Sequence, residues 1–376
     1  MLVETIKIEI DGREAADIYP DVTYVEVELD DELPGMFRLR LPMLLRPDGS
    51  WTFLDDERFR AWTPVVISVG LDGPPEEIIS GHITHAKPTF DPDPTRCVLD
   101  VWGLDGSVLL DREDRLTAWP NRKDSDIATE IFGAYGLSSE VQDTEVVHDD
   151  AVSTIIQRET DWRFLGRLAR RNGFECYVEG TTGHFRAPRL DRRPQALLAV
   201  HFGDETNVDR LSLEVNGMTP ANVAMHQLER DTRQVLSVTV DSADERRLGA
   251  TGPPAGPGAG PGSGPATLVL GQTVTTGAAE MTNLCRGIFQ QQEWFVTGGG
   301  EAAANELGAV LKPRGTVTVK GIGETFSGVY LVSHVVHSFS EDGYVQRFEV
   351  KRNGLLPTGA EDFAAAGLPG LPGGAR

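Results

Sequence analysis

The sequence predicts an α+β fold that is mainly β, in which two antiparallel sheet regions lie on either side of a small α+β unit. Apolar and polar residues alternate from about residue 5 to residue 110 and again from about residue 199, with the two-residue period of half-buried strands. Between these regions the apolar residues follow the period of amphipathic helices. The chain has 376 residues, of which 40% are hydrophobic and 24% charged, so it is long enough for two or three folded domains.

Residues 1–112 form the first predicted sheet region, a small sheet or barrel. The alternation is clearest at Val25, Glu26, Val27, Glu28 and Leu29. Turn-forming pairs separate the expected strands, at Asp11-Gly12, Asp48-Gly49, Asp72-Gly73 and Asp105-Gly106. Residues 1–60 carry 15 acidic and 7 basic side chains, so we expect the polar face of this sheet to be acidic.

Residues 113–195 form the predicted α+β unit. Cap residues and apolar spacing predict three helices: from Asp124 or Ser125 to Gly136, around Val152, Ile155 and Ile156, and from Thr160-Asp161 to Asn172-Gly173. A hairpin is expected at residues 174–188. Residues 161–193 hold 8 basic and 4 acidic side chains, and this contrast with the rest of the chain favours docking against an acidic neighbour or subunit.

Residues 196–355 form the second predicted sheet region. It is interrupted by residues 251–266, of which 11 of 16 are Gly or Pro, and we expect this tract to be a flexible surface loop. A helix is predicted next, with one apolar face made by Ala278, Met281, Leu284, Cys285 and Ile288. The region ends in a strand pair, residues 328–339 and 343–353, and residues 356–376 are expected to form a flexible tail.

The chain is strongly acidic, with 57 acidic and 35 basic side chains and a net charge of −22, which disfavours direct binding to nucleic-acid phosphates. A negatively charged surface would instead repel DNA or an acidic cargo and let it move past without binding. Cys97, Cys176 and Cys285 lack the spacing of a zinc ribbon or a disulfide framework, which is typical of a reducing compartment. The N-terminal residues do not resemble a secretory signal, and no apolar run approaches the roughly 18 residues of a membrane-spanning helix.

No arrangement of residues in the sequence predicts a catalytic, cofactor or metal site. His82 and His85 have i, i+3 spacing, as do His334 and His337, and in strands this spacing places the two side chains on opposite faces. Carboxylate runs at residues 30–32, 55–57 and 149–150 could supply a glycosidase pair, although such runs are typical of solvated loops. The glycine cluster at residues 321–328 is expected to be a hairpin turn, because no helix follows it to hold a phosphate.

The segment IIQRETDWRFLGRLARRNG, residues 155–173, resembles a signature of the phage late-control D and VgrG-like tail hub family. In that family an Ile-Gln start, a Thr-Asp-Trp step, Phe-Leu, Leu-Ala and a final Gly recur on one helical hairpin. The matching positions in this chain are Ile156, Gln157, Thr160, Asp161, Trp162, Phe164, Leu165, Leu168, Ala169 and Gly173.

The C-terminal sheet region also resembles the ending of that family, which has a glycine-rich turn, an FSG step, and then a His and a GY step before a final Phe strand. The matching positions are Gly321, Phe326, Ser327, Gly328, Tyr330, His337, Gly343, Tyr344 and Phe348. The two motifs lie in the family's order, and the resemblance covers most of residues 1–355.

The resemblance implies two tail-tube-like antiparallel β-barrel domains, residues 1–112 and 196–355, with residues 113–195 as a small inserted α+β domain. It implies a structural baseplate hub that forms a homotrimer and adapts a hexameric inner tube to the trimeric spike of a contractile injection system or phage tail. The implied partners are the inner tube protein, the spike and other baseplate components, and no cofactor is implied. Assembly in the bacterial cytoplasm, as part of a virion or an injection particle, is expected.

The chain departs from VgrG-type proteins, which continue into an OB-fold and a β-helical needle. We therefore expect the spike to be a separate protein and the hub to have no enzymatic activity. Two alternatives stay open. A tail-associated cell-wall hydrolase would need a carboxylate pair or a metal in a cleft. A hexameric tube or sheath component would have a single barrel in each chain.

Overall fold

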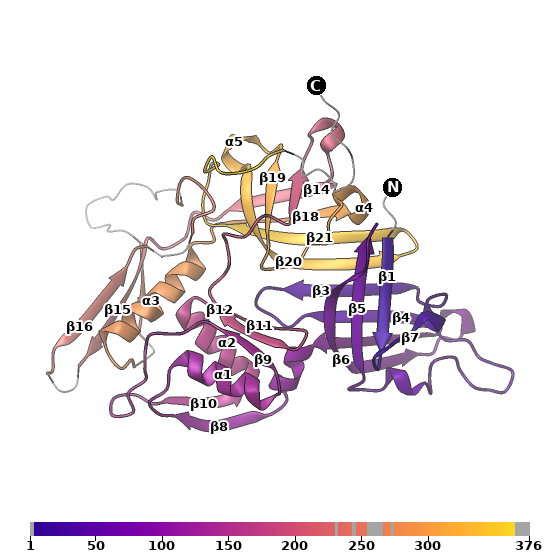
Figure 1. The fold of residues 1–376 in the computed structure, drawn as a ribbon, viewed down its shortest axis with the longest axis horizontal. Coiled ribbons are helices and arrows are strands. Elements are labelled where there is room, and N and C mark those ends of the chain that lie inside the picture. Colours follow the sequence, from indigo (N-terminus) through magenta and orange to yellow (C-terminus); the bar gives the residue numbers. More distant parts are fainter. Residues whose placement is uncertain (1–3, 230–231, 243–245, 254–265, 272–273, 365–376) are drawn as a thin grey trace.

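The computed structural model describes residues 4–229, 232–242, 246–253, 266–271 and 274–364. A wide sheet forms one side of the molecule, and two smaller units project from its other side (Figure 1). Strands predominate over helices in the described residues, which confirms the predicted mainly β, α+β class. Residues 254–265 of the Gly/Pro-rich tract and residues 365–376 of the expected tail lie outside the described residues.

The first sheet region is a run of antiparallel strands in the order β3-β4-β7-β6-β5-β1-β2. These strands are β1 (Glu4–Ile10), β2 (Arg13–Glu14), β3 (Tyr24–Asp30), β4 (Met36–Pro42), β5 (Pro64–Leu71), β6 (Glu76–Thr89) and β7 (Val98–Asp105). Residues 76–82 of β6 pair with β5 and residues 81–89 pair with β7, and the pairing with β7 shifts register between Ile83 and His85. In Figure 1, β1 and β5 consequently cross over β3, β4 and β7. The core enclosed between them includes Ile8, Val27, Phe37 and Val65.

The second sheet region contains β13 (Ala196–Ala199), β14 (Arg210–Val215), β18 (Val296–Ala303), β19 (Thr316–Lys320), β20 (Gly328–Ser340) and β21 (Gly343–Arg352), with the short helices α4 (Ala304–Leu307) and α5 (Gly323–Phe326). The strand order is β14-β18-β21-β20, and β19 pairs with the beginning of β20. Its core includes Leu198, Phe295, Val317, Tyr330 and Phe348. The glycine cluster lies in the connection between the antiparallel strands β19 and β20, where α5 forms one short turn of helix.

Strand β20 joins the two regions into one sheet. Its first residues pair with β19, and after a register shift between Val332 and His334 its later residues pair with β3. The pairs run from His334 opposite Asp30 to Phe339 opposite Val25. Strand pairing among the described residues does not close either region into a barrel. Both regions are bent sheets within a 13-stranded whole.

The small unit contains β8 (Asp114–Trp119), α1 (Asp124–Ala134), β9 (Ser138–Val141), β10 (Ile155–Thr160), α2 (Asp161–Asn172), β11 (Glu175–Glu179) and β12 (Thr182–Arg186). The predicted helices at 124–136 and 160–173 and the predicted hairpin are confirmed. The helix predicted around Val152, Ile155 and Ile156 is wrong. Ile155 is buried, Ile156 exposed and Gln157 buried, so this segment has a two-residue period and pairs with β8 as strand β10.

A third group of elements projects from the second sheet region. It comprises β15 (Asn222–Leu228), β16 (Val235–Val240), β17 (Thr267–Leu270) and the predicted helix α3 (Ala278–Gln292). The three strands pair only with one another among the described residues, and α3 covers one face of their sheet with its own core of Val223, Met225, Met281 and Cys285. Within the described ranges, no helix has the length and apolar character needed to cross a bilayer.

Candidate functional site

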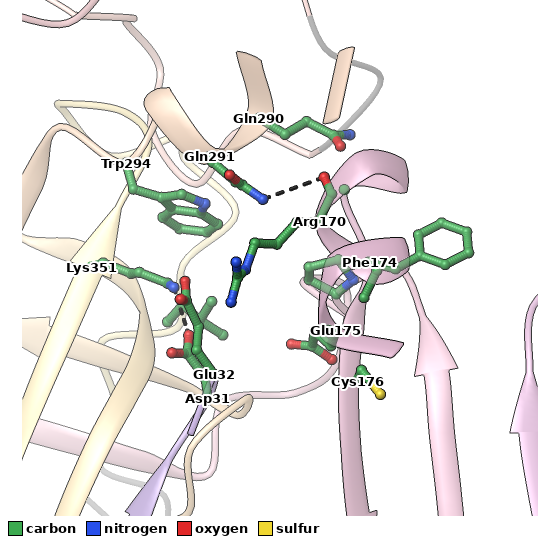
Figure 2. A pocket seen from close by; sticks show the side chains of 15 residues that line it. Asp31, Glu32, Arg170, Phe174, Glu175, Cys176, Gln290, Gln291, Trp294 and Lys351 are labelled. Carbon is green, nitrogen blue, oxygen red and sulfur yellow. Dashed lines mark hydrogen bonds and ion pairs between the residues drawn. The ribbon is translucent and has the colours of Figure 1, made fainter. Parts of the chain in front are cut away.

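A cavity of about 260 Å³ lies where the first sheet region, the small unit and the second sheet region meet. Asp31 and Glu32 reach it from the end of β3, Glu175 from β11, and Lys351 from β21. Figure 2 shows Arg170, in the last turn of α2, extending between these acidic side chains and Trp294. The expectation that the basic small unit meets an acidic neighbour thus has a counterpart inside the chain, because the acidic end of β3 faces this unit.

Asp31 and Lys351 form the ion pair on one side of this cavity. The Lys351 Nζ and Asp31 Oδ2 atoms are 2.5 Å apart, and the ammonium lies 5.3 Å from the centre of the Trp294 ring. Burial raises the pKa of Asp31, and the neighbouring charges of Lys351 and Arg314 act in the opposite direction. The pair fastens β21 of the second region to the end of β3 in the first.

Glu175 lies opposite this pair, at the start of β11, and its side chain points into the same cavity in Figure 2. Its Oε2 atom is buried without a hydrogen-bond partner in the described part of the chain. Burial raises the pKa of Glu175, while the charges of Arg314 and Arg186 lower it. A buried carboxyl without full compensation is costly, so the position of these two arginines controls how stable the junction is.

Arg314 connects all three parts of the chain. It precedes β19, and its backbone has a φ of 65°, in the left-handed region. Its guanidinium carbon lies 4.0 Å from the centre of the Tyr177 ring in β11, and its Nη2 donates a hydrogen bond of 2.7 Å to the carbonyl of Asp30 in β3. His184 stacks on the same tyrosine with ring centres 4.4 Å apart.

A second buried charge cluster joins the small unit to α3. Both ring nitrogens of His148 face carboxylate oxygens, with Nε2 2.8 Å from Asp124 Oδ1 and Nδ1 3.4 Å from Glu280 Oε1. Arg171 pairs with Glu280, and Asn172 donates a 2.7 Å hydrogen bond to Asp124. Burial would lower the pKa of His148, but its hydrogen bonds with the two carboxylates raise it above the ordinary value. Burial opposes ionisation of Glu280 too, yet His148 and Arg171 lower its pKa to about 2.

Two glycines allow α2 and α3 to approach at this cluster. Gly173 ends α2 with a φ of 66°, and a Cβ atom there would lie 1.7 Å from the Gln290 side chain. A Cβ atom on Gly287 would lie 2.8 Å from the carbonyl oxygens of Arg170 and Arg171. The last turn of α2 therefore packs directly on the backbone of α3.

A sequence profile described as the Alg8 N-terminal domain matches residues 2–341. The chain belongs to the Alg8 N-terminal domain family. A search of curated proteins gives no match for this family member.

Solved structures with the fold of this Alg8 N-terminal-domain chain include several tail proteins. The 43 kDa tail protein of prophage MuSo2 from Shewanella oneidensis aligns over 93% of this chain and 99% of its own, with 15% identity and a TM-score of 0.65. A tail protein from Neisseria meningitidis MC58 aligns over 93% and 96%, with 14% identity and a TM-score of 0.63. The E. coli c3393 protein aligns over 93% and 76%, with 12% identity and a TM-score of 0.52. The predicted resemblance to tail hubs is confirmed at the level of the fold.

The first set of signature residues in this family member lies on β10 and α2, so the expected helical hairpin is a strand followed by a helix. Thr160 caps α2 by accepting a hydrogen bond from the Arg163 amide, and Asp161 is buried, accepting hydrogen bonds from Gln157 and Tyr135. The core positions are Phe164, Leu165, Leu168 and Ala169, with Trp162 packed at their edge. Ile156 is exposed and Gly173 ends the helix.

The second set of signature residues lies around β20 and β21. Phe326 and Ser327 precede β20, and their carbonyls accept hydrogen bonds from Arg352, which is fully buried. Gly328 faces the same guanidinium, so that a side chain there would collide with it. The remaining members are Gly321 with a φ of 87°, Tyr330, the bonded pair His337 and Tyr344, Gly343 in the hairpin turn and Phe348 in the core.

Of the candidate metal and catalytic residues, Asp31 and Glu32 line the cavity described above, and the others lie elsewhere. His85 stacks on Trp102, whereas His334 pairs with Glu28, and His337 is fully buried beside Tyr344 with its pKa lowered to about 3 by burial. Asp56 pairs with Arg58, and residues 149–150 lie in an exposed loop. In the residues that the structure describes, no three potential ligand side chains are placed to hold a metal ion.

Sequence reasoning missed Arg314, His148, Glu280 and Arg352. Each is a charged or titratable residue without a local motif, and its partners lie far away in the sequence. Of these four residues, only Arg352 could have been identified from the sequence. It lies at an inward-facing position of a strand in which apolar and polar residues alternate. The arrangement as a whole holds three parts of the chain together through buried charges.

Proposed function

We propose that this chain is a structural baseplate hub, three copies of which adapt a hexameric inner tube to a trimeric spike in a phage tail or contractile injection system. The likeness to tail proteins over nearly the whole chain supports a tail-associated structural role. The E. coli c3393 protein is described as a type VI secretion system component with similarity to the T4 tail proteins gp27 and gp5. In this proposal residues 1–112 and 196–355 are the two tube-like domains, and residues 113–195 are the inserted domain.

The observation that carries the proposal is a run of eight strands with an unpaired edge at each end. The run is β14-β18-β21-β20-β3-β4-β7-β6. Strand β14 pairs only with β18 among the described strands, and residues 84–89 of β6 pair only with β7. Long unpaired edges in a sheet are templates for pairing with another chain.

The even number of strands in the run allows identical copies to join edge to edge into a closed ring. All the pairs along it are antiparallel, so in an even-numbered run β14 and β6 point in opposite directions. Edge β14 of one copy can therefore join edge β6 of the next as another antiparallel pair. Repeating this contact head to tail generates a closed ring, and three copies would supply six sheet regions to a hexameric tube.

The face of this run that lies away from the two cores would line the ring. Its charges alternate from strand to strand, with Glu26 opposite Arg38, Glu301 opposite Arg347, and Arg40 bonded to Asp100. The face is thus not uniformly acidic as the sequence led us to expect, because the acidic side chains of β3 stand beside the arginines of β4. Paired charges of this kind attract a charged passenger less strongly than a face of one sign would.

The proposal is tested by measuring native mass across a concentration series, for the protein alone and together with candidate spike and inner tube proteins. We expect a species of about 123 kDa, three times the 40.9 kDa chain, and imaging should give rings with threefold symmetry and a continuous wall. A monomer at every concentration and with every partner would contradict the proposal. Sixfold rings would instead favour a tube or sheath component.

A cell-wall hydrolase is the second candidate, and one observation favours it. Asp31 and Glu175 line the same cavity as Trp294, and burial raises the pKa of both carboxyl groups. The ion pair between Lys351 and Asp31 argues against this function, because it engages one of the two carboxyl groups. A peptidoglycan-release assay of the protein and of Glu175→Gln separates the two functions, because the structural hub predicts no turnover by either, whereas the hydrolase predicts turnover that the substitution abolishes.

A further inference from the structure

Trp62 is held on the surface at considerable conformational cost. Its side chain is 44% exposed, and its backbone has a φ of 73°, a conformation that bulky residues rarely adopt. Its amide donates a 2.7 Å hydrogen bond to the carbonyl of Ile83, at the point where β6 loses its pairing with β5. The guanidinium of Arg112 lies 4.5 Å from the centre of the indole ring. Trp62 therefore stands beside the beginning of the free edge of β6.

Met218 is the counterpart at the other end of the run. It is 89% exposed, the highest value among the exposed large hydrophobic side chains of the described residues. It lies three residues after Val215, the last residue of β14, which is 36% exposed. The amide of Met218 donates a 2.9 Å hydrogen bond to the Asn216 side chain, which fixes the shape of the turn. Two apolar side chains thus mark the end of the free edge of β14.

Antiparallel joining brings these two places together. The end of β14 must lie beside the beginning of the free part of β6, and that is where Trp62 is bonded to Ile83. From this geometry we infer that the partner subunit's Met218 and the partner subunit's Val215 pack on Trp62 and form the apolar centre of the contact between copies. This inference rests on the proposed trimeric hub and names the surface through which it would assemble.

The chemistry of the two sides is complementary. A thioether gains energy from contact with an aromatic ring, and the flexible methionine side chain adapts to the shape of the ring. Arg112 over the indole adds a charged neighbour of the kind that accompanies tryptophan at the centre of protein interfaces. Removing both exposed apolar groups from water on association gives a reason for the strained backbone at Trp62.

The experiment compares assembly of the full chain with that of Trp62→Ala, Met218→Ser and the double variant. We expect each single substitution to raise the concentration for half-assembly by roughly ten-fold or more, and the double variant to cost less than the product of the two effects. Leu116→Ser is the matched control, because Leu116 is 80% exposed on β8, which lies apart from β14 and β6 in Figure 1. It should assemble as the unchanged protein does.

Cross-linking gives an independent measurement. In Trp62→Cys combined with Met218→Cys, a short bifunctional thiol reagent should join neighbouring copies, while Cys97, Cys176 and Cys285 are buried. Trimers that form equally well in all variants and do not cross-link would overturn this inference and leave the trimeric hub standing. A wild-type chain that stays monomeric would overturn both. Met218 is almost fully exposed, so its substitution tests the contact even if the Trp62 variants fold poorly.

Discussion

The guanidinium of Arg314 lies 4.0 Å from the centre of the Tyr177 ring and also donates to the carbonyl of Asp30. One side chain from the second sheet region therefore contacts both the small unit and the first sheet region. The cation also lies close enough to Asp31 and Glu175 to oppose the effect of burial on their pKa values. Arg314 thus helps to orient three parts of the chain, although no local sequence motif points to it.

Replacing Arg314 with Gln should destabilise the protein. The substitution removes the cation from the tyrosine ring and leaves two buried carboxyl groups with less positive charge around them. We expect a loss of about 2 kcal/mol in the free energy of unfolding, measured by urea denaturation. Arg189→Gln is the control, since Arg189 is half-exposed and pairs with the exposed Glu140, and it should change stability by less than about 0.5 kcal/mol.

The His148 cluster should make the stability of the protein fall as the pH rises, and His148→Gln should weaken this dependence. Because the folded pKa of His148 lies above 6.5, its contribution is fully present below about pH 6.5 and is lost as the pH rises through the folded value. Glu280 acts oppositely, since its folded pKa of about 2 lies below 4.5, and its contribution is lost as the pH falls from 4.5 toward 2.

The measurement is the free energy of unfolding from about pH 5 to about pH 9, where carboxylates such as Glu280 stay ionised. The wild-type protein should lose stability toward the alkaline end more steeply than His148→Gln. His226→Gln, an exposed histidine on β15, should retain the wild-type slope. Equal slopes for all three proteins would mean that His148 does not bind its proton more tightly in the folded state.

The close contact of α2 and α3 predicts opposite effects of alanine at two glycines. Gly287→Ala places a Cβ atom 2.8 Å from two carbonyl oxygens, and we expect it to cost about 1–3 kcal/mol. Gly166→Ala, inside α2, meets nothing within 4 Å and should stabilise the helix by about 0.5–1 kcal/mol. Thermal unfolding should give a lower midpoint temperature for Gly287→Ala and a higher one for Gly166→Ala than for the wild type. An unchanged midpoint for Gly287→Ala would mean that α2 and α3 can move apart at little cost.

The sequence predicted those elements whose signals are local. Thr160 and Gly173 delimit α2 as a cap and a left-handed stop, and both signals can be recognised within a few residues. The alternation that predicted strands also placed the ends of the hairpin strands β20 and β21 to within one residue. The segment near Ile155 misled us because a short apolar pair fits a helix and a strand equally well, and only its pairing with β8 decides between them.

The junction and the shared strand could not be predicted in this way. Lys351 and Asp31 are paired across most of the chain length, and neither residue differs in its local context from other surface charges. The acidic face was expected from composition, yet composition does not say that Glu26 will stand beside Arg38. Such relationships are created by the register between strands, and register depends on the whole fold.

The passage of β20 from β19 to β3 also has a mechanical consequence. Hydrogen bonds in an antiparallel pair are perpendicular to the strands. A force parallel to the strands therefore loads the six facing pairs between β20 and β3 in shear. All of these pairs must yield together, whereas a force across the sheet would unzip them one after another. The two sheet regions should therefore withstand a larger force parallel to the β20 and β3 strands than perpendicular to them. A force applied along the strand direction to one region should be transmitted to the other without separating them.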